Sequence, residues 1–213
     1  MGSVTFGNAV TVSASYGAGG SFIAPRLAEE LKIPFIDRLI SAEDAALGRA
    51  SGEGLSEAER ASSPVGRFLS YFARSGSDTV IGPDPVIEDD ESIRQRTESA
   101  LQDVAAGAPA VVLGRAGAIV LASRPRTFHV RLDGPVDRRL KWAGQFERFD
   151  EEALRRRQAE ADRVRSSFVK RLYHVDSASA SLYHLVLDPT VLGVDRALHV
   201  VLTASTDYFE ANP

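Results

Sequence analysis

Short apolar runs of strand length recur along the chain, and helix-length stretches separate most of them. The runs are residues 9–13, 33–37, 109–114, 127–132 and 183–188. A strand that returns parallel to its predecessor needs a crossover of about a dozen residues or more, which a helix usually supplies. The pattern therefore predicts an α/β fold with a doubly wound parallel sheet.

Apolar residues at helical spacing predict two helices that pack on this sheet. The first follows the first strand and is expected to begin at about Ser21, because proline at position 25 is tolerated only in the first turn of a helix. The second closes the chain against the sheet. The apolar positions are Ile23, Leu27 and Leu31 in the first helix, and Val194, Ala197, Leu198 and Val201 in the last.

Residues 41–90 interrupt the alternation of strands and helices. They are rich in Gly, Pro, Ser and acidic side chains, so we interpret them as a mobile insertion. Partial helical spacing then predicts a helix over residues 91–106, with Ser92 available as its cap. We therefore expect a single domain over residues 1–213 that contains an insertion at 41–106.

A charge-dense stretch at residues 135–175 predicts two more helices joined by a basic hinge. Arginine and lysine crowd residues 162–171, where Ser166 and Ser167 could permit movement. A solvated charged helix is the commoner explanation of such a run.

Composition narrows the class of protein. Apolar residues make up 44% and charged residues 25%, as in ordinary globular proteins. No apolar run approaches the ~20 residues of a bilayer crossing, and the first ten residues lack a signal-peptide pattern. With no cysteine, disulfides and thiolate metal sites are excluded, and we expect a cytoplasmic protein. The net charge of −4 disfavours duplex nucleic acid as a partner, so any anion site must be local.

Residues 10–31, VTVSASYGAGGSFIAPRLAEEL, combine a strand, a glycine-rich turn and a helix. Small residues in such a turn let backbone N–H groups converge on an anion, which the positive end of the helix dipole also attracts. A tight connection that needs glycine only for its dihedral freedom is equally consistent with the sequence. A dinucleotide fold is disfavoured, because Phe22 stands where the third glycine of G-x-G-x-x-G would fall.

In the order and spacing of four segments, the sequence resembles the cytidylate kinase-like family of P-loop nucleoside monophosphate kinases. The segments are residues 10–40, 111–118, 161–176 and 183–198. The resemblance implies a five-stranded parallel sheet with helices on both faces and an ATP site, with Mg²⁺, at the glycine turn. It further implies a nucleoside monophosphate site under the inserted helices and an arginine-bearing lid over residues 135–175.

The resemblance also implies roles for individual residues. It assigns phosphate binding to the glycine turn, at Gly17, Ala18, Gly19, Gly20 and Ser21. It assigns binding of the acceptor nucleotide to Asp37 and Arg115. Catalytic roles in the lid go to Asp162, Arg163 and Arg165. Arg38, next to Asp37, is included in the acceptor site. Each has a simpler alternative: Asp37 could cap the next helix, Arg115 could pair with a surface carboxylate, and the lid arginines could be solvated.

Two positions depart from the family pattern. Most phosphate-loop kinases use a lysine to neutralise the transferring phosphoryl group and a hydroxyl to hold magnesium, but this chain has Gly20 and Phe22 there. Lysine-free relatives often carry YGSGGR, with arginine where this chain has Ser21. Loss of such a charge could cost about 3–4 kcal/mol of transition-state stabilisation. Catalysis would then depend on Arg38 or on the lid arginines.

Three functions remain open at this level. The first is ATP-dependent phosphoryl transfer to CMP or a related monophosphate. The second is a non-catalytic degenerate kinase that binds a nucleotide or an anion as a sensor or interaction module. The third is an interaction protein in which Tyr71 and Phe72 of the insertion form a homodimer surface. The expected partners are nucleotide substrates, without nucleic acid or membrane.

Overall fold

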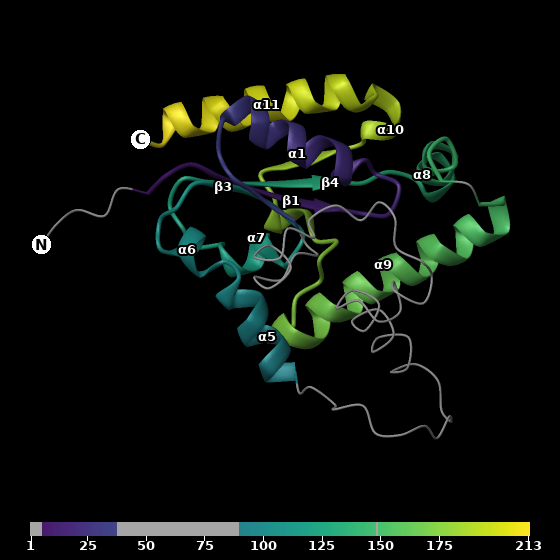
Figure 1. Ribbon diagram of the computed structural model, residues 1–213, viewed down its shortest axis with the longest axis horizontal. Helices are drawn as coiled ribbons and strands as arrows, with labels where there is room; N and C mark the ends of the chain where they lie inside the picture. Colours follow the sequence, from purple (N-terminus) through teal and green to yellow (C-terminus); the bar gives the residue numbers. More distant parts are fainter. Residues whose placement is uncertain (1–5, 38–89, 148) are drawn as a thin grey trace, which may run out of the picture. The chain divides into compact units, whose positions relative to one another are not determined.

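The computed structural model describes residues 6–37, 90–147 and 149–213 (Figure 1). The chain divides into two compact units, Met1–Arg38 with Leu101–Pro213, and Leu39–Ala100. In the second unit the described element is helix α5 (Asp90–Ser99), in which Arg94 pairs with Glu91 at 2.7 Å. The elements described below belong to the first unit.

A five-stranded parallel sheet with the strand order β2-β3-β1-β4-β5 forms the centre of the first unit. Its strands are β1 (Ala9–Ala14), β2 (Phe35–Ile36), β3 (Ala110–Leu113), β4 (Thr127–Leu132) and β5 (Leu185–Leu187). In the register of the central strands, Val10 lies opposite Val111 on one side and Phe128 on the other. The predicted five-stranded parallel sheet is thus confirmed.

Helices cover both faces of this sheet, which explains why its strands are nearly continuous apolar runs. The helices of this unit are α1 (Gly20–Leu31), α6 (Gln102–Ala105), α7 (Gly117–Val120), α8 (Val136–Ala143), α9 (Glu151–Tyr173), α10 (Pro189–Leu192) and α11 (Val194–Ala211), with a 3-10 turn at Ala180–Leu182. Of these, α8 and α9 pack against each other. In Figure 1, α1 and the yellow α11 lie side by side on one face. Ile23, Leu27 and Val201 are buried there, while Leu101 and Leu121 join the core of the opposite face.

The first helix differs from its prediction at its start. It begins at Gly20, so Pro25 lies beyond the first turn and removes one helical hydrogen bond. The helix continues because its apolar side, with Ile23 and Leu27 fully buried, packs against the sheet. Burial of each such side chain contributes about 1.5–3 kcal/mol, which offsets the local cost of proline.

The predicted helix over residues 91–106 is two helices. Helix α5 ends at Ser99 and α6 starts at Gln102. Since α5 begins at Asp90, Ser92 lies inside the helix and not at its start. Helix α10 was not predicted; the side chain of Asp188 caps it by accepting the Thr190 N–H at 3.0 Å.

Two helices form over the charge-dense stretch, but the predicted hinge at residues 162–171 is wrong. These residues lie within the continuous helix α9, and the connection from α8 falls at residues 144–150. Asp150 caps α9 by accepting the Ala153 N–H at 2.7 Å. Serine costs a helix only a few tenths of a kcal/mol, roughly, so Ser166 and Ser167 do not break it.

Several sequence-based interpretations fall outside the described residues. They concern Arg38, the insertion up to residue 89, and the aromatic pair Tyr71 and Phe72. Within the described ranges, no helix is both long enough and apolar enough to cross a bilayer.

Candidate functional site

The turn between β1 and α1, residues 15–20, has the backbone geometry of an anion-binding loop. Gly17 and Gly19 adopt φ angles of 73° and 78°, in the left-handed region that favours glycine. Gly19 is the N-cap of α1, so the positive end of the helix dipole faces this glycine turn. The turn can therefore attract an anionic group.

Two of the glycines are also required by packing. A Cβ atom at Gly17 would lie 2.4 Å from the carbonyl oxygen of Arg139, and one at Gly20 would lie 2.5 Å from the Cβ of Ala14. Both the phosphate-loop interpretation and the tight-connection interpretation are consistent with these contacts. At Gly20, the position that the resemblance aligns with the loop lysine, an added Cβ would clash with Ala14.

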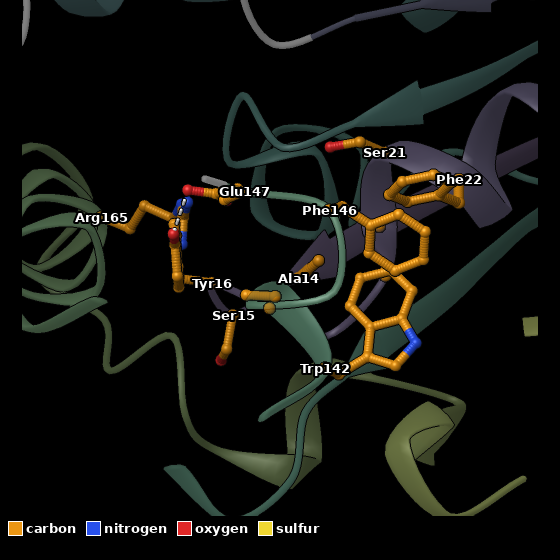
Figure 2. Close-up of a pocket in the computed structure, with 13 residues that line it drawn as sticks. Ala14, Ser15, Tyr16, Ser21, Phe22, Trp142, Phe146, Glu147 and Arg165 are labelled. Atoms are coloured by element: carbon orange, nitrogen blue, oxygen red, sulfur yellow. Dashed lines mark hydrogen bonds between the residues drawn. The ribbon is translucent and has the colours of Figure 1, made fainter. Parts of the chain in front are cut away.

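A pocket of about 120 Å³ opens beside the glycine turn (Figure 2). The predicted phosphate-binding residues Gly17, Gly19, Gly20 and Ser21 line it, whereas Ala18 is buried in the core. Its other walls are formed by Phe22, Trp142, Phe146, Glu147 and Arg165, among others. Ligand pockets usually measure about 300–1,000 Å³, so this one can admit a phosphate group but not a whole nucleotide.

The two predicted lid arginines have different surroundings. Arg165 lines the pocket and pairs with Asp162 at 3.1 Å. Arg163 pairs with Glu160 at 2.9 Å on an exposed part of α9, and it does not line the pocket. Of the two, Arg165 is therefore the cation that the fold brings to the glycine turn.

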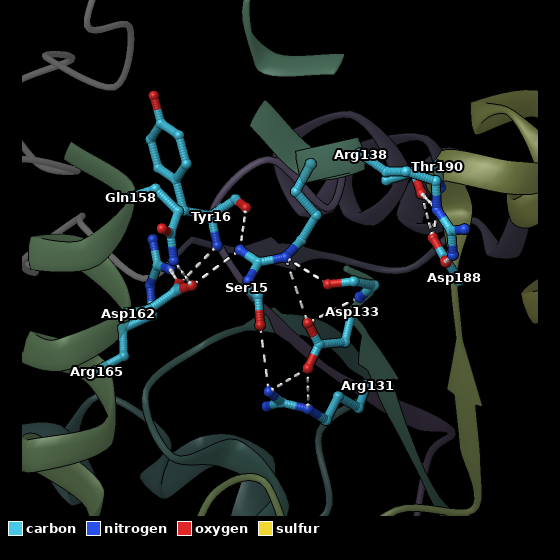
Figure 3. A network of polar contacts seen from close by, with 12 residues as sticks. Ser15, Tyr16, Arg131, Asp133, Arg138, Gln158, Asp162, Arg165, Asp188 and Thr190 are labelled. Carbon is cyan, nitrogen blue, oxygen red and sulfur yellow. Dashed lines mark hydrogen bonds and ion pairs between the residues drawn. The ribbon is translucent and has the colours of Figure 1, made fainter. Parts of the chain in front are cut away.

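The Asp162 carboxylate connects α9 to the glycine turn (Figure 3). It accepts the Tyr16 backbone N–H at 2.9 Å and the Arg139 Nη1 donor at 2.9 Å. It also accepts from Gln158 at 2.8 Å and from Arg165 at 3.1 Å. Four donors, two of them guanidinium groups, therefore hold the Asp162 carboxylate between α9 and the glycine turn.

Arg139 holds the glycine turn by a hydrogen bond to its backbone, and this role was not predicted from the sequence. Its buried guanidinium donates to the carbonyl oxygens of Tyr16 at 2.6 Å and Gly134 at 2.8 Å. Its neighbour Arg138 is exposed and pairs with Asp188. Helical spacing is the signal that distinguishes the buried arginine, because Arg139 lies next to Leu140 and four residues before Ala143 on the buried side of α8.

Asp133, directly after β4, completes this polar network. Burial alone would raise the pKa of its carboxyl. The Gly134 N–H, the Arg131 hydrogen bond and the Arg131 charge together lower the pKa below its usual value. Arg131 also donates to the Ser15 hydroxyl at 3.2 Å, so the ionised Asp133 helps to fix the start of the glycine turn.

Tyr16 forms a further link that was not predicted from the sequence. Its hydroxyl donates to Glu147 at 2.5 Å. Burial, followed by the hydrogen bond and charge of Glu147, raises the pKa of Tyr16 to about 12, although Arg157 opposes the shift. The phenol therefore stays protonated at neutral pH and remains a hydrogen-bond donor.

The predicted acceptor-side residues meet at the carboxyl ends of two neighbouring parallel strands. Asp37 follows β2, Arg115 follows β3, and the Arg115 Nε donates to the Asp37 carbonyl oxygen at 2.8 Å. Arg115 and Ala116 have φ angles of 52° and 50°, so the chain turns sharply here. Burial lowers the pKa of Arg115, and the charge of Asp37 opposes this shift. Ligands of open α/β sheets bind at this edge.

A magnesium site can be tested against the same geometry. No group of three His, Asp or Glu side chains that could hold a metal occurs among the residues that the structure describes. The Ser21 side chain, however, lines the pocket next to the glycine turn. A single hydroxyl ligand is compatible with Mg²⁺, because this ion usually takes its other ligands from phosphate oxygens and water.

Comparison with known proteins gives a family and a fold. A model described as the cytidylate kinase-like family matches residues 9–191. No curated protein sequence matches the chain. An uncharacterised protein from Eubacterium ventriosum superposes with a TM-score of 0.62 at 16% identity, covering 96% of this chain and 98% of that one. A shikimate kinase from Bacteroides thetaiotaomicron gives a TM-score of 0.49 at 14% identity, covering 95% and 98%.

Proposed function

This chain belongs to the cytidylate kinase-like family, and from that premise we propose that it transfers a phosphoryl group from ATP to a nucleoside monophosphate, with CMP as the leading acceptor. One observation carries the proposal: a glycine turn at the N-terminus of α1 shares a pocket with the cationic Arg165. An oxygen of the acceptor phosphate attacks the γ-phosphorus of ATP, and ADP leaves. Such a step depends mainly on positioning and on stabilisation of charge.

In this proposal the glycine turn binds the ATP phosphates and Arg165 supplies the charge that lysine supplies elsewhere. Arg165 approaches the turn from α9, with Asp162 connecting that helix to the Tyr16 N–H. A guanidinium suits this role because it contacts phosphate oxygens in a bidentate manner. The Ser21 hydroxyl would hold Mg²⁺, which neutralises charge on the phosphates when it is bound.

Asp37 and Arg115 form the acceptor side of the proposed site. Arg115 is held to the end of β2 by its bond to the Asp37 carbonyl, at the sheet edge where ligands of this fold class bind. A guanidinium at this place can bind the phosphate of the monophosphate.

The proposal is tested by measuring ADP formation from ATP with CMP, UMP, AMP and GMP as acceptors. We expect turnover with at least one monophosphate, CMP first, and dependence on Mg²⁺. In the same assay Arg115→Ala should raise the KM for the acceptor and leave ATP affinity unchanged. No ADP formation with any acceptor, in a folded protein, would contradict the enzyme hypothesis.

A second function, nucleotide binding without catalysis, is favoured by Gly20, because a glycine stands where the loop would carry its lysine. A non-catalytic protein would bind nucleotide without turning it over. Its signature would be an ATP-dependent rise in melting temperature, since a ligand that binds only the folded state stabilises it by RT ln(1 + [L]/Kd). Stabilisation without ADP formation would select this alternative.

A further inference from the structure

Three aromatic side chains meet beside the glycine turn. Phe22 lies in the first turn of α1, whereas Trp142 lies in α8 and Phe146 follows that helix. The Phe22 ring centroid is 5.2 Å from that of Trp142 and 5.1 Å from that of Phe146, and the last two are 4.8 Å apart. We call these three residues the aromatic cluster.

The aromatic cluster keeps much of its surface in water. Phe22 is 41% exposed and Phe146 is 56% exposed, although phenylalanine is among the residues most often buried. Exposed apolar side chains that lie together and are rimmed by polar residues are typical of interaction sites. The exposure is therefore more consistent with a role in ligand contact than with a role in the core.

The pocket has two chemically different sides (Figure 2). The rings of Phe22, Trp142 and Phe146 lie together on one side, and Arg165 lies with Tyr16 and Glu147 on the other. The glycine turn and Arg165 suit an anion, while the rings suit a flat, apolar group. A nucleotide carries both features in one molecule. The pocket of about 120 Å³ has space for phosphate only, so a base would lie over the outer faces of the rings.

We propose that the aromatic cluster is a stacking platform for the base of the nucleotide whose phosphates occupy the glycine turn. This inference rests on the proposed function, because it assumes that a nucleotide binds there. Phenylalanine rings offer no hydrogen bonds, and every base has a π-face, so the platform tolerates different bases. ATP, GTP and CTP should therefore bind with similar affinity.

The test compares ATP with inorganic tripolyphosphate, which has the phosphates but no base. Phe146→Ala should weaken ATP binding by about 5- to 150-fold, the factor that corresponds to loss of one base–aromatic contact. Its affinity for tripolyphosphate should not change. Phe149→Ala is the matched control: Phe149 is 46% exposed and lies beneath the Arg157 guanidinium at 4.5 Å, and it does not line the pocket.

Two further variants separate stacking from apolar contact. Phe146→Tyr keeps an aromatic face and should retain ATP affinity, whereas Phe146→Leu keeps apolar bulk without a ring and should bind ATP as weakly as the alanine variant. Trp142 is the only tryptophan in the sequence and so serves as a fluorescent reporter inside the cluster. In the parent protein, ATP should quench its fluorescence and tripolyphosphate should not.

The possible results distinguish a failure of the stacking platform from a failure of the proposed function. Unchanged ATP affinity in Phe146→Ala, or equal affinities of the parent protein for ATP and tripolyphosphate, would overturn the platform while the anion site and the turnover assay still stand. A parent protein that binds neither compound would overturn the proposed function and the platform together.

Discussion

At the scale of single residues, the packing of Gly20 disfavours a lysine in the glycine turn, so the proposed site takes its cation from another part of the chain. Its missing Cβ would lie 2.5 Å from the Cβ of Ala14, so a lysine side chain cannot start from this position without displacing β1. Arg165 reaches the same pocket from α9. The cation and the glycine turn are therefore contributed by elements far apart in the sequence.

The role that we propose for Arg165 leads to a kinetic prediction. Arg165→Ala should lower kcat by about 100- to 1,000-fold, the usual effect of removing one group that stabilises transition-state charge. Arg165→Lys should restore little, because an ammonium cannot make the bidentate contact. Steady-state ADP formation measures both effects, and ATP affinity should change much less than kcat.

Arg163 supplies the matched control for this experiment. It lies on the same helix but pairs with Glu160 on an exposed surface, so Arg163→Ala should leave kcat close to that of the parent protein. Equal losses in the Arg163 and Arg165 variants would contradict the specific role of Arg165.

At the scale of elements, Arg124 joins the segments that precede the central strands. This side chain is 7% exposed and donates to the carbonyl oxygens of Gly7 at 2.8 Å, Val104 at 2.5 Å and Ala108 at 3.0 Å. It also donates to the Thr127 hydroxyl at 3.0 Å. Val104 lies in α6, and the other groups lie at the amino ends of β1, β3 and β4, whereas the glycine turn and Arg115 follow the carboxyl ends of β1 and β3.

Replacing Arg124 should therefore affect stability and spare the site. Arg124→Met leaves several buried carbonyl groups without their donor and should lower the free energy of unfolding by about 3 kcal/mol or more. Chemical denaturation measures the loss. Arg196→Met, at an exposed position of α11, is the control and should stay within about 0.5 kcal/mol of the parent. A stable Arg124→Met protein would show that the carbonyl groups find other donors.

At the scale of the whole molecule, a buried histidine makes stability depend on pH. His129 of β4 is 5% exposed, and its Nδ1 lies 2.7 Å from the Thr11 hydroxyl. The ring of His184 lies 5.0 Å away, and the His184 Nδ1 accepts the His129 backbone N–H. Burial, with a smaller contribution from the charge of His184, lowers the pKa of His129 to about 4.

The direction of the pH effect follows from these values. The unfolded chain binds the His129 proton below pH 6.5 or so, whereas the folded protein binds it only below about pH 4. The contribution to stability is therefore complete above pH 6.5 and is lost as the pH falls towards 4, by about 3 kcal/mol in total. Denaturation at several pH values should show a smaller decrease in His129→Gln than in the parent protein.

His199 provides the control for the pH measurement. It is exposed on α11, so His199→Gln should keep the pH dependence of the parent protein. If His129→Gln also kept the full decrease between pH 6.5 and 4, another group would have to be responsible.

The sequence by itself determined the sheet and the glycine turn. Apolar runs such as residues 109–114 gave the strands, because a strand buried on both faces must be apolar along most of its length. Helical spacing at Ile23 and Leu27 gave the helix that packs on them. These signals are local, because each depends on residues within one helix or strand. The repeat of apolar and polar positions along the sequence directly reflects the geometry of that element.

Only the tertiary structure decided which of several similar side chains reach the pocket. Arg165 lines the pocket while Arg163 does not, although both lie in the charged helix α9. Phe22 meets Trp142 and Phe146 from a distant part of the sequence. Neighbouring positions on a helix point in different directions, and the direction that faces a site is set by packing against elements remote in sequence, which local spacing does not record.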